Sequence, residues 1–345
     1  MTGDIGLAHG AGAREMWEFI QKYIVSKVPE NLWKTRGGHG LDILDDGAII
    51  RIGDSYLVVS IDSYTVNPIF FKGGNIGELA VSGTLNDLVM MGAKPIAFMD
   101  TIVVEEGFPI RDLEIIVESM VKILSKEGVP LIGGDFKVMP KGSIDRIVIT
   151  GVGLGFSEKP VIDKMIREND RIIVTGPIAE HGAVIMAHQL GMDDEIRDLR
   201  SDTRPLTRTV LPVIMKYRDY IHAARDPTRG GLAATLYEWV YGSDLAIAID
   251  RSRIPIRDSV RFFLDALGID PLNMACEGVG VLAVEPSVAD DVVRELRSRG
   301  EEYAAIIGKV VRASNPLLRG RVIAITEVGG KVVIEPRSVN LPRIC

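Results

Sequence analysis

Apolar segments with the spacing of β-strands alternate along the chain with segments of helical spacing, and the pattern breaks once, between Ser157 and Pro160. Before the break it predicts a two-stranded hairpin and two helices, at residues 48–51, 55–61, 75–91 and 111–127. A second series of strands and helices follows the break. Because one hydrophobic core rarely organises 345 residues, we expect an α/β fold with two domains, residues 1–157 and 158–333.

Composition narrows the class of protein. Hydrophobic residues make up 46% of the chain and charged residues 25%, which is typical of a globular protein. A net charge of −7 argues against nucleic acid as a partner, and an anionic ligand would have to arrive with a cation. No apolar run reaches the roughly 18 residues of a membrane span, and the start lacks the features of a secretion signal. With only two cysteines, the sequence predicts a cytoplasmic protein without a membrane association.

The two cysteines differ in their surroundings. Cys276 adjoins an apolar strand and is expected to be a buried, inert thiol. Cys345 is the last residue of IEPRSVNLPRIC, residues 334–345, which carry two prolines and no periodicity. This segment is predicted to be an extended, mobile tail with an exposed thiol. The residues alone leave open whether that thiol has a function.

Aspartates in the first half suggest a cation site. Reflection of the hairpin through Gly53-Asp54 places Asp45 opposite Asp62, and Asp46 opposite Ile61. Carboxylates that face one another repel unless a cation or a raised pKa relieves them. Their oxygens suit Mg²⁺ carried by phosphates, although a solvated turn at Asp45-Asp46 would explain these residues equally well.

Three further aspartates fit the same hypothesis. Asp87 lies on the small, apolar side of its predicted helix, where an unpaired charge is costly, so it is either a ligand or a buried acid satisfied by other groups. Asp135 follows two glycines at the end of an apolar strand, where a ligand can approach the backbone. Asp226 precedes a proline and could simply cap a helix.

Recognised phosphate-binding motifs are absent from the sequence. No GxxxxGK[ST] motif occurs, and Gly151-Val152-Gly153-Leu154-Gly155 lacks the spacing of a dinucleotide fingerprint. The glycine-rich segments at residues 8–14 and 36–40 could wrap phosphates, or they could be plain loops.

Several motifs together give the chain a resemblance to a known family: LDILDDGA, EEGFPIRDLEIIVESM, GGDFKVMPKG, RDPTRGGL and the terminal LPRIC. They resemble the HypE family of hydrogenase maturation proteins, within the aminoimidazole ribonucleotide synthetase (PurM-like) superfamily. The resemblance implies a two-domain PurM-like α/β fold. In this fold two N-terminal domains pair into a dimeric β-barrel around the ATP sites, and the chain is a homodimer.

The resemblance also implies a reaction. HypF would place a carbamoyl group on Cys345, and the protein would dehydrate it with ATP to a thiocyanate, whose cyano group passes to iron on the HypC–HypD complex for a [NiFe] hydrogenase. Glu277 would act as a base and Lys137 would stabilise an oxyanion or shuttle a proton. ATP and Mg²⁺ would be bound by the aspartates, namely Asp45, Asp46, Asp62, Asp87, Asp135 and Asp226. A small-molecule kinase of the same superfamily and a non-catalytic, nucleotide-gated maturation scaffold are the competing interpretations.

Overall fold

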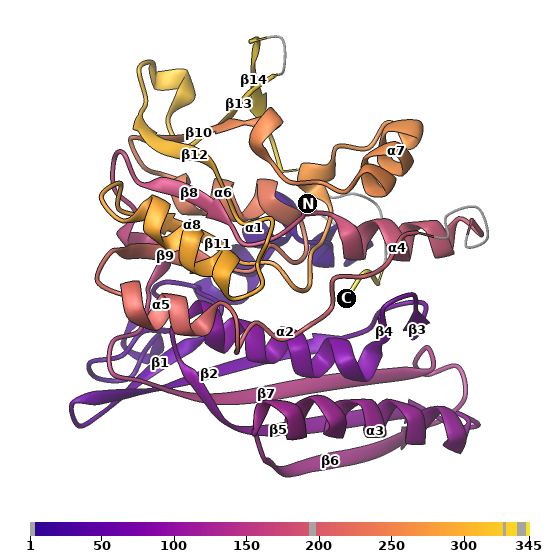
Figure 1. Ribbon diagram of the computed structural model, residues 1–345. Coiled ribbons are helices and arrows are strands. Elements are labelled where there is room, and N and C mark those ends of the chain that lie inside the picture. Colours follow the sequence, from indigo (N-terminus) through magenta and orange to yellow (C-terminus); the bar gives the residue numbers. More distant parts are fainter. Residues whose placement is uncertain (1–3, 193–197, 327–328, 337–342) are drawn as a thin grey trace.

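The structure, a computed structural model, describes residues 4–192, 198–326, 329–336 and 343–345. Two β-sheets form two layers with helices between them (Figure 1). The lower sheet has the strand order β1-β2-β7-β5-β6. Its strands are β1 (Ala48–Ile52), β2 (Ser55–Tyr64), β5 (Lys94–Glu105), β6 (Leu131–Met139) and β7 (Ile147–Ser157). Only β5 and β6 are parallel, and α3 (Ile110–Glu127) connects them.

The upper sheet has the order β14-β13-β10-β12-β8-β11-β9. Its strands are β8 (Arg171–Val174), β9 (Ile221–Arg225), β10 (Leu245–Asp250), β11 (Val281–Val284), β12 (Ala305–Arg312), β13 (Val322–Ile325) and β14 (Lys331–Ile334). Its helices are α4 (Glu180–Gln189), α5 (Leu211–Tyr217), α6 (Gly231–Val240), α7 (Asp258–Leu267) and α8 (Ala289–Ser298). The predicted break at residue 158 therefore falls between the last strand of one sheet and the first strand of the other, and the α/β fold class is confirmed.

The hairpin and both helices of the first half form as predicted. β1 and β2 pair from Ala48↔Val59 to Ile52↔Ser55 around the Gly53-Asp54 turn. The remaining elements of this half are α1 (Ala13–Tyr23), α2 (Ile76–Met90) and a small pair, β3 (Phe70–Phe71) with β4 (Gly74–Asn75).

Helix α2 is the element that places the site. It begins after Asn75, whose side-chain oxygen accepts from the amides of Gly77 at 2.8 Å and Glu78 at 3.2 Å. We expected one buried stripe, but nearly every residue of α2 is buried. The reason is its position between the lower sheet and the upper domain (Figure 1), which its apolar and small residues permit on all sides. Asp87 consequently lies at the boundary between the two domains.

Among the residues that the structure describes, no helix is both long and apolar enough to cross a lipid bilayer.

Candidate active site

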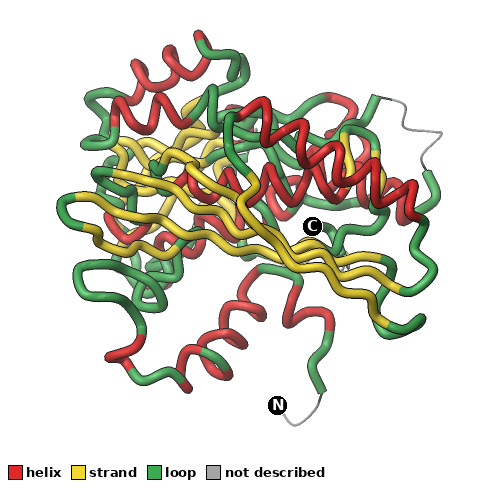
Figure 2. Tube along the Cα trace, turned by 90° about the horizontal axis from the view of Figure 1, so that it is seen from below, coloured by secondary structure: helices red, strands yellow, loops and turns green. Residues whose placement is uncertain are grey.

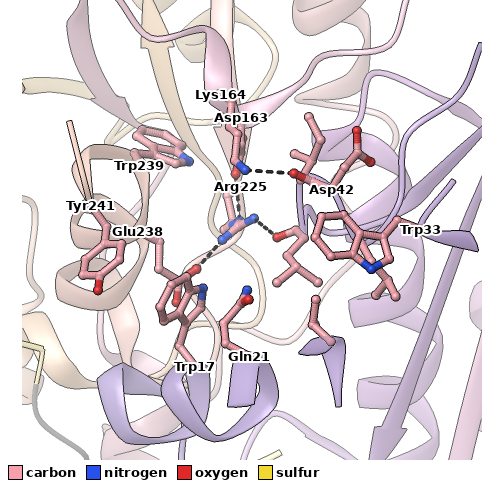
Figure 3. Close-up of a pocket in the computed structure, with 14 residues that line it drawn as sticks. Trp17, Gln21, Trp33, Asp42, Asp163, Lys164, Arg225, Glu238, Trp239 and Tyr241 are labelled. Atoms are coloured by element: carbon pink, nitrogen blue, oxygen red, sulfur yellow. Dashed lines mark hydrogen bonds and ion pairs between the residues drawn. The ribbon is translucent and has the colours of Figure 1, made fainter. Parts of the chain in front are cut away.

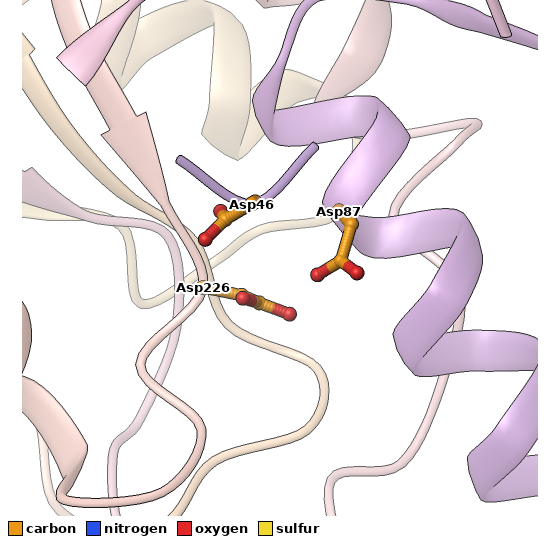
Figure 4. Close-up of side chains that lie close together, drawn as sticks. All are labelled: Asp46, Asp87 and Asp226. Atoms are coloured by element: carbon orange, nitrogen blue, oxygen red, sulfur yellow. The ribbon is translucent and has the colours of Figure 1, made fainter. Parts of the chain in front are cut away.

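Three buried carboxylates from distant parts of the chain meet at this boundary. Asp46 precedes β1, Asp87 belongs to α2 and Asp226 follows β9, and one oxygen of each lies within 4.8 Å of the others (Figure 4). The hydroxyl of Ser60, on β2, donates a hydrogen bond to Asp87. One oxygen each of Asp46 and Asp226 is buried without a hydrogen-bond partner among the described residues. Unpartnered, converging carboxylate oxygens are the ligand set of a hard cation, so these residues fit Mg²⁺.

The same crowding acts on the acidity of the three groups. Burial raises the pKa of Asp46 and of Asp87 well above the usual range. Burial, followed by the nearby charge of Asp62, raises the pKa of Asp226 to about 7. Without a cation, the cluster therefore holds protons that an exposed aspartate would have lost.

Arg225, the last residue of β9, is the counter-charge of this cluster. Its Nε lies 3.0 Å from Asp46 Oδ1 and 2.9 Å from Asp163 Oδ2, and its guanidinium also pairs with Glu238 (Figure 3). It donates a further hydrogen bond of 3.0 Å to the carbonyl of Leu44. Arg225 is thus ion-paired with Asp46 Oδ1, while Asp46 Oδ2 has no hydrogen-bond partner among the described residues.

The predicted pairing of Asp45 with Asp62 is wrong. Strand β1 begins at Ala48, so the ladder ends three residues beyond Asp45. The side chain of Asp45 instead accepts a hydrogen bond of 3.0 Å from the amide of Asp163 and lies 3.8 Å from Arg225. Asp45 therefore supports the arginine rather than facing Asp62 across the hairpin.

Asp62 lies on β2 next to the cluster. Burial raises its pKa, and Arg229 acts in the opposite direction. Its charge in turn raises the pKa values of Asp87 and Asp226, so all of these groups share one electrostatic environment.

The prediction of an exposed terminal thiol is also wrong. Cys345 is only 9% exposed and packs with the apolar core around α2. Burial raises the pKa of its thiol to about 12, and Arg229 opposes the shift. The main-chain oxygen of Cys345 accepts from the amide of Thr65 at 3.0 Å. Residues 337–342, the rest of the predicted tail, lie outside the described residues.

Glu277 lies in the same environment as Cys345. It is 1% exposed, and both of its carboxylate oxygens lack a hydrogen-bond partner among the described residues. Burial raises its pKa well above the usual range, and its charge in turn raises the pKa of the Cys345 thiol. A buried, unpartnered carboxylate of raised pKa is suited to take up a proton.

A cavity of about 840 Å³ opens beside these groups. It is lined by residues 5–7 and 9–11 of the N-terminal segment, by Thr65 and Arg229, and by the chain end at residues 343–345. Gly12 has a φ of +78°, and a Cβ there would come within 2.6 Å of the main chain of Arg229. This glycine therefore allows the N-terminal segment to approach the RDPTRGG loop.

Asp135 and Lys137 do not join this cluster within one chain. Both lie on the edge strand β6, where Lys137 donates to Asp135, and the side chains of Lys137 and Asp135 are 61% and 57% exposed. The expected ligand site at Asp135 thus has no partner from the cluster in the described part of the chain.

The structure also shows the surroundings of Asp226 and Cys276. Asp226 does not cap α6, because the residue at that position is Gly230. Cys276 is fully buried, as predicted, and its sulfur accepts a hydrogen bond of 3.2 Å from the amide of Ala179.

Comparison with known proteins gives the family. Residues 44–156 match the AIR synthase related protein N-terminal domain, and residues 167–318 match the corresponding C-terminal domain. The carbamoyl dehydratase HypE of Rhizobium leguminosarum bv. viciae is 37% identical over all of this chain and 96% of its own length. This chain belongs to the HypE family.

Solved structures of the HypE family have the same fold. A HypE in complex with ATP superimposes with a TM-score of 0.80 at 34% identity, covering 99% of this chain and 100% of that one. A HypE in a HypE–HypF complex gives a TM-score of 0.83 at 32% identity, covering 92% and 99%.

Five residues of this HypE family member were not predicted from its sequence as site residues: Asp163, His181, Asp202, Arg225 and Arg229. Arg225 carried a signal, since a charged residue that ends an apolar strand directly before Asp226 needs a buried partner. Asp202 carried no such signal in the sequence. Its Oδ2 accepts from the amides of Glu277 and Gly278 at 3.0 Å each and thereby fixes the loop that carries Glu277.

Proposed function

We propose that this protein is an ATP-dependent carbamoyl dehydratase that converts a thiocarbamate on its own Cys345 into a thiocyanate, the source of the cyanide ligand of a [NiFe] hydrogenase. The observation that carries the proposal is the burial of Cys345 in one electrostatic environment with Glu277, Asp62 and Asp226. A thiol placed there reaches acid–base and cation-binding groups without a separate substrate.

The chemistry assigns a task to each group. The carbamoyl oxygen is a poor leaving group until it takes the γ-phosphoryl group of ATP, releasing ADP. The phosphate then leaves with that oxygen, and the nitrogen gives up both of its protons as the carbon–nitrogen triple bond forms. Glu277 would accept a proton from this nitrogen, because its carboxylate is buried, unpartnered and of raised pKa. Arg229 would balance the charge that develops beside Cys345.

Mg²⁺ would neutralise charge on the phosphates of ATP and orient them for transfer. Asp46, Asp87 and Asp226 would hold it, since their oxygens converge within 4.8 Å. Asp62 would extend this acidic surface, and Asp45 would act indirectly, through Arg225.

A homodimer is part of the proposal. Figure 2, seen from below, looks onto the lower sheet, whose outer face carries exposed apolar side chains. On the outer face they are Ile61, Met99 and Phe156, and the edge strand β6 adds the exposed side chains of Ile132, Phe136 and Val138. Apolar side chains beside an unpaired edge strand favour burial against a second copy. Asp135 and Lys137 lie on that edge, so a role for either in the ATP site depends on this pairing.

The burial of Cys345 determines how the proposed partner proteins can gain access to it. A thiol that is 9% exposed cannot be reached by another enzyme, so the chain end has to leave the site for loading by HypF and for delivery of the cyano group to HypC–HypD. Dehydration would occur while the chain end is in the site and Cys345 is buried.

The test is the mass of the terminal peptide after incubation with HypF, carbamoyl phosphate, ATP and Mg²⁺. We expect a carbamoyl adduct on Cys345 that converts to a cyano adduct, lighter by one water. Glu277→Gln should stop at the carbamoyl adduct, and Glu285→Gln, an acid outside the site, should convert normally. Cyanide delivery to HypC–HypD by Cys345→Ala would overturn the proposal. Transfer of the γ-phosphoryl group of ATP to a free metabolite by the unloaded protein would instead indicate the kinase.

A further inference from the structure

We propose that His181 is a positioning residue that holds residues 343–345 in the site by binding the main-chain carbonyl of Ile344. The inference rests on the proposed function only where it concerns rates of dehydration; the holding contact itself stands on geometry.

Two carbonyls of the chain end are bound from the N-terminal domain. The amide of Thr65 donates to Cys345 at 3.0 Å and the amide of Asn67 donates to Arg343 at 2.9 Å. Residues 343–345 therefore lie along residues 65–67 without forming a β-bridge, and Arg343 has a φ of +60°. The carbonyl between the two bound ones, that of Ile344, accepts from neither amide.

His181 takes that carbonyl from the opposite side. Its Nε2 lies 2.6 Å from the oxygen of Ile344, and it belongs to the first turn of α4 in the C-terminal domain. The chain end is thus bound between two domains, with main-chain donors on one side and one imidazole on the other. Gln189, at the far end of α4, donates to the carbonyl of Asn67 at 2.9 Å, so the same helix also contacts residues 65–67, along which the chain end lies.

The neighbours of His181 fix its protonation. A carbonyl only accepts, so Nε2 carries the hydrogen and Nδ1 must accept from the hydroxyl of Ser201, 2.8 Å away. The imidazole is fully buried, with Phe71 edge-on at 5.3 Å between ring centroids. Burial lowers its pKa to about 4, which favours the neutral ring that this arrangement needs. His181 is therefore a pre-oriented donor rather than a mobile surface group.

The carboxylate of Asp202 connects the contact between His181 and Ile344 to the loop that carries Glu277. Asp202 Oδ1 accepts from the amide of His181 at 3.1 Å, and its Oδ2 accepts from the amides of Glu277 and Gly278. The position of the chain end and the position of the proposed base are consequently set by the same side chain. A histidine that only filled space in the core would need neither the Ile344 contact nor this connection.

The test measures how often the chain end leaves the site. Alkylation of Cys345 by iodoacetamide requires that exposure, and its rate is read from the mass of the terminal peptide. We expect His181→Ala to react at least tenfold faster than the parent, a factor that corresponds to about 1.4 kcal/mol. His181→Gln, which keeps a donor near the position of Nε2, should restore most of the protection. His188→Ala, an exposed histidine of the same helix, is the matched control and should react like the parent.

Two outcomes separate the possibilities. Equal alkylation rates for His181→Ala, His188→Ala and the parent would overturn the inference. If His181→Ala does not fold, Ser201→Ala, which removes the partner of Nδ1 together with the contacts of this hydroxyl with Thr203, should give an intermediate rate. A parental rate for Ser201→Ala, together with a rate for His181→Gln equal to that of the denatured parent, would also overturn the inference.

The catalytic consequence is measured separately. In carbamoylated protein, His181→Ala should slow single-turnover dehydration at least tenfold and leave the KM for ATP unchanged, because the contact that is lost is with the chain end that carries the reacting group. If the parent forms no thiocyanate, the proposed function fails while the alkylation ratio still decides the holding contact.

Discussion

The guanidinium of Arg225 lies 3.0 Å from the carboxylate of Asp46, one of the three acids that converge at the domain boundary. The arginine supplies positive charge where the proposed function places Mg²⁺ and the phosphates. It forms an ion pair with one oxygen of Asp46, and the other oxygen has no hydrogen-bond partner among the described residues, which leaves it available to a cation.

Arg225→Met should therefore destabilise the protein. The change leaves Asp46, Asp163 and Glu238 without their buried partner, which typically costs about 3–5 kcal/mol. Urea unfolding measures the free energy, and Mg²⁺ should recover part of the loss. Arg299→Met breaks an exposed pair with Glu295 and should cost less than about 1 kcal/mol. Equal losses for the two variants would contradict the role given to Arg225.

Asp87→Asn should have opposite effects on stability and on ligand binding. Removing one of the crowded charges relieves repulsion, so the metal-free protein should gain about 1 kcal/mol. Binding of ATP in the presence of Mg²⁺, measured by calorimetry, should weaken at least tenfold. Asp219→Asn, on the surface, is the control. Parental binding that is as tight in chelator as in Mg²⁺ would rule out the cation site.

Phe136→Glu should dissociate the proposed homodimer. Phe136 is 52% exposed on the edge strand β6, and a carboxylate buried there would be unpaired. We expect a dissociation constant at least a hundredfold higher by light scattering or sedimentation. Phe262→Glu changes a side chain that is 80% exposed on α7, outside this sheet, and should leave the dimer intact. A monomeric parent at micromolar concentration would refute the dimer itself.

The buried position of Cys345 changes the expectation for its removal. An exposed thiol would be dispensable for stability, but Cys345→Ala deletes a sulfur packed in the core and should cost about 1 kcal/mol, similar to Cys276→Ala. The two variants should differ in chemistry, because only Cys345→Ala loses the adduct seen by mass spectrometry. A cyano adduct missing from Cys276→Ala would assign that residue a role that its buried hydrogen bond with Ala179 does not suggest.

Local patterns predicted what depends on local structure. The hairpin at Gly53-Asp54, helix α2 and the break near residue 158 follow from turn residues and apolar spacing. The shared site of Asp46, Asp87 and Asp226 was an implication of the family resemblance, while the residues alone indicated only that Asp87, a charge among small apolar residues, needs a ligand or another compensating group.

Contacts between distant segments could not be predicted in this way. His181 and Ile344 are 163 positions apart, and Asp202 and Glu277 are 75 apart, so no periodicity relates them. The Pro-containing end looked like a free tail because its docking partner, residues 65–67, carries no motif for it. Asp135 and Lys137 fit the family pattern, but on the edge strand β6 their surroundings would depend on the second copy of the proposed homodimer, which local sequence patterns do not encode.

The pH dependence of stability should carry the signature of His181. Burial lowers its pKa from 6.5 to about 4, so the unfolded chain takes up a proton that the folded chain refuses. Its contribution is fully present above pH 6.5 and is lost as the pH falls towards 4, at about 1.4 kcal/mol per pH unit and on the order of 3 kcal/mol in all. Burial raises the pKa values of Asp202 and Glu180, so these two acids add stability as the pH falls, in the parent and in every variant alike. Urea unfolding of the parent and of His181→Gln between about pH 7 and pH 4.5 isolates the histidine, because the acids cancel in the difference. The parent should lose stability relative to His181→Gln as the pH falls, and a difference that stays constant over this range would mean that the imidazole is not held neutral in the fold.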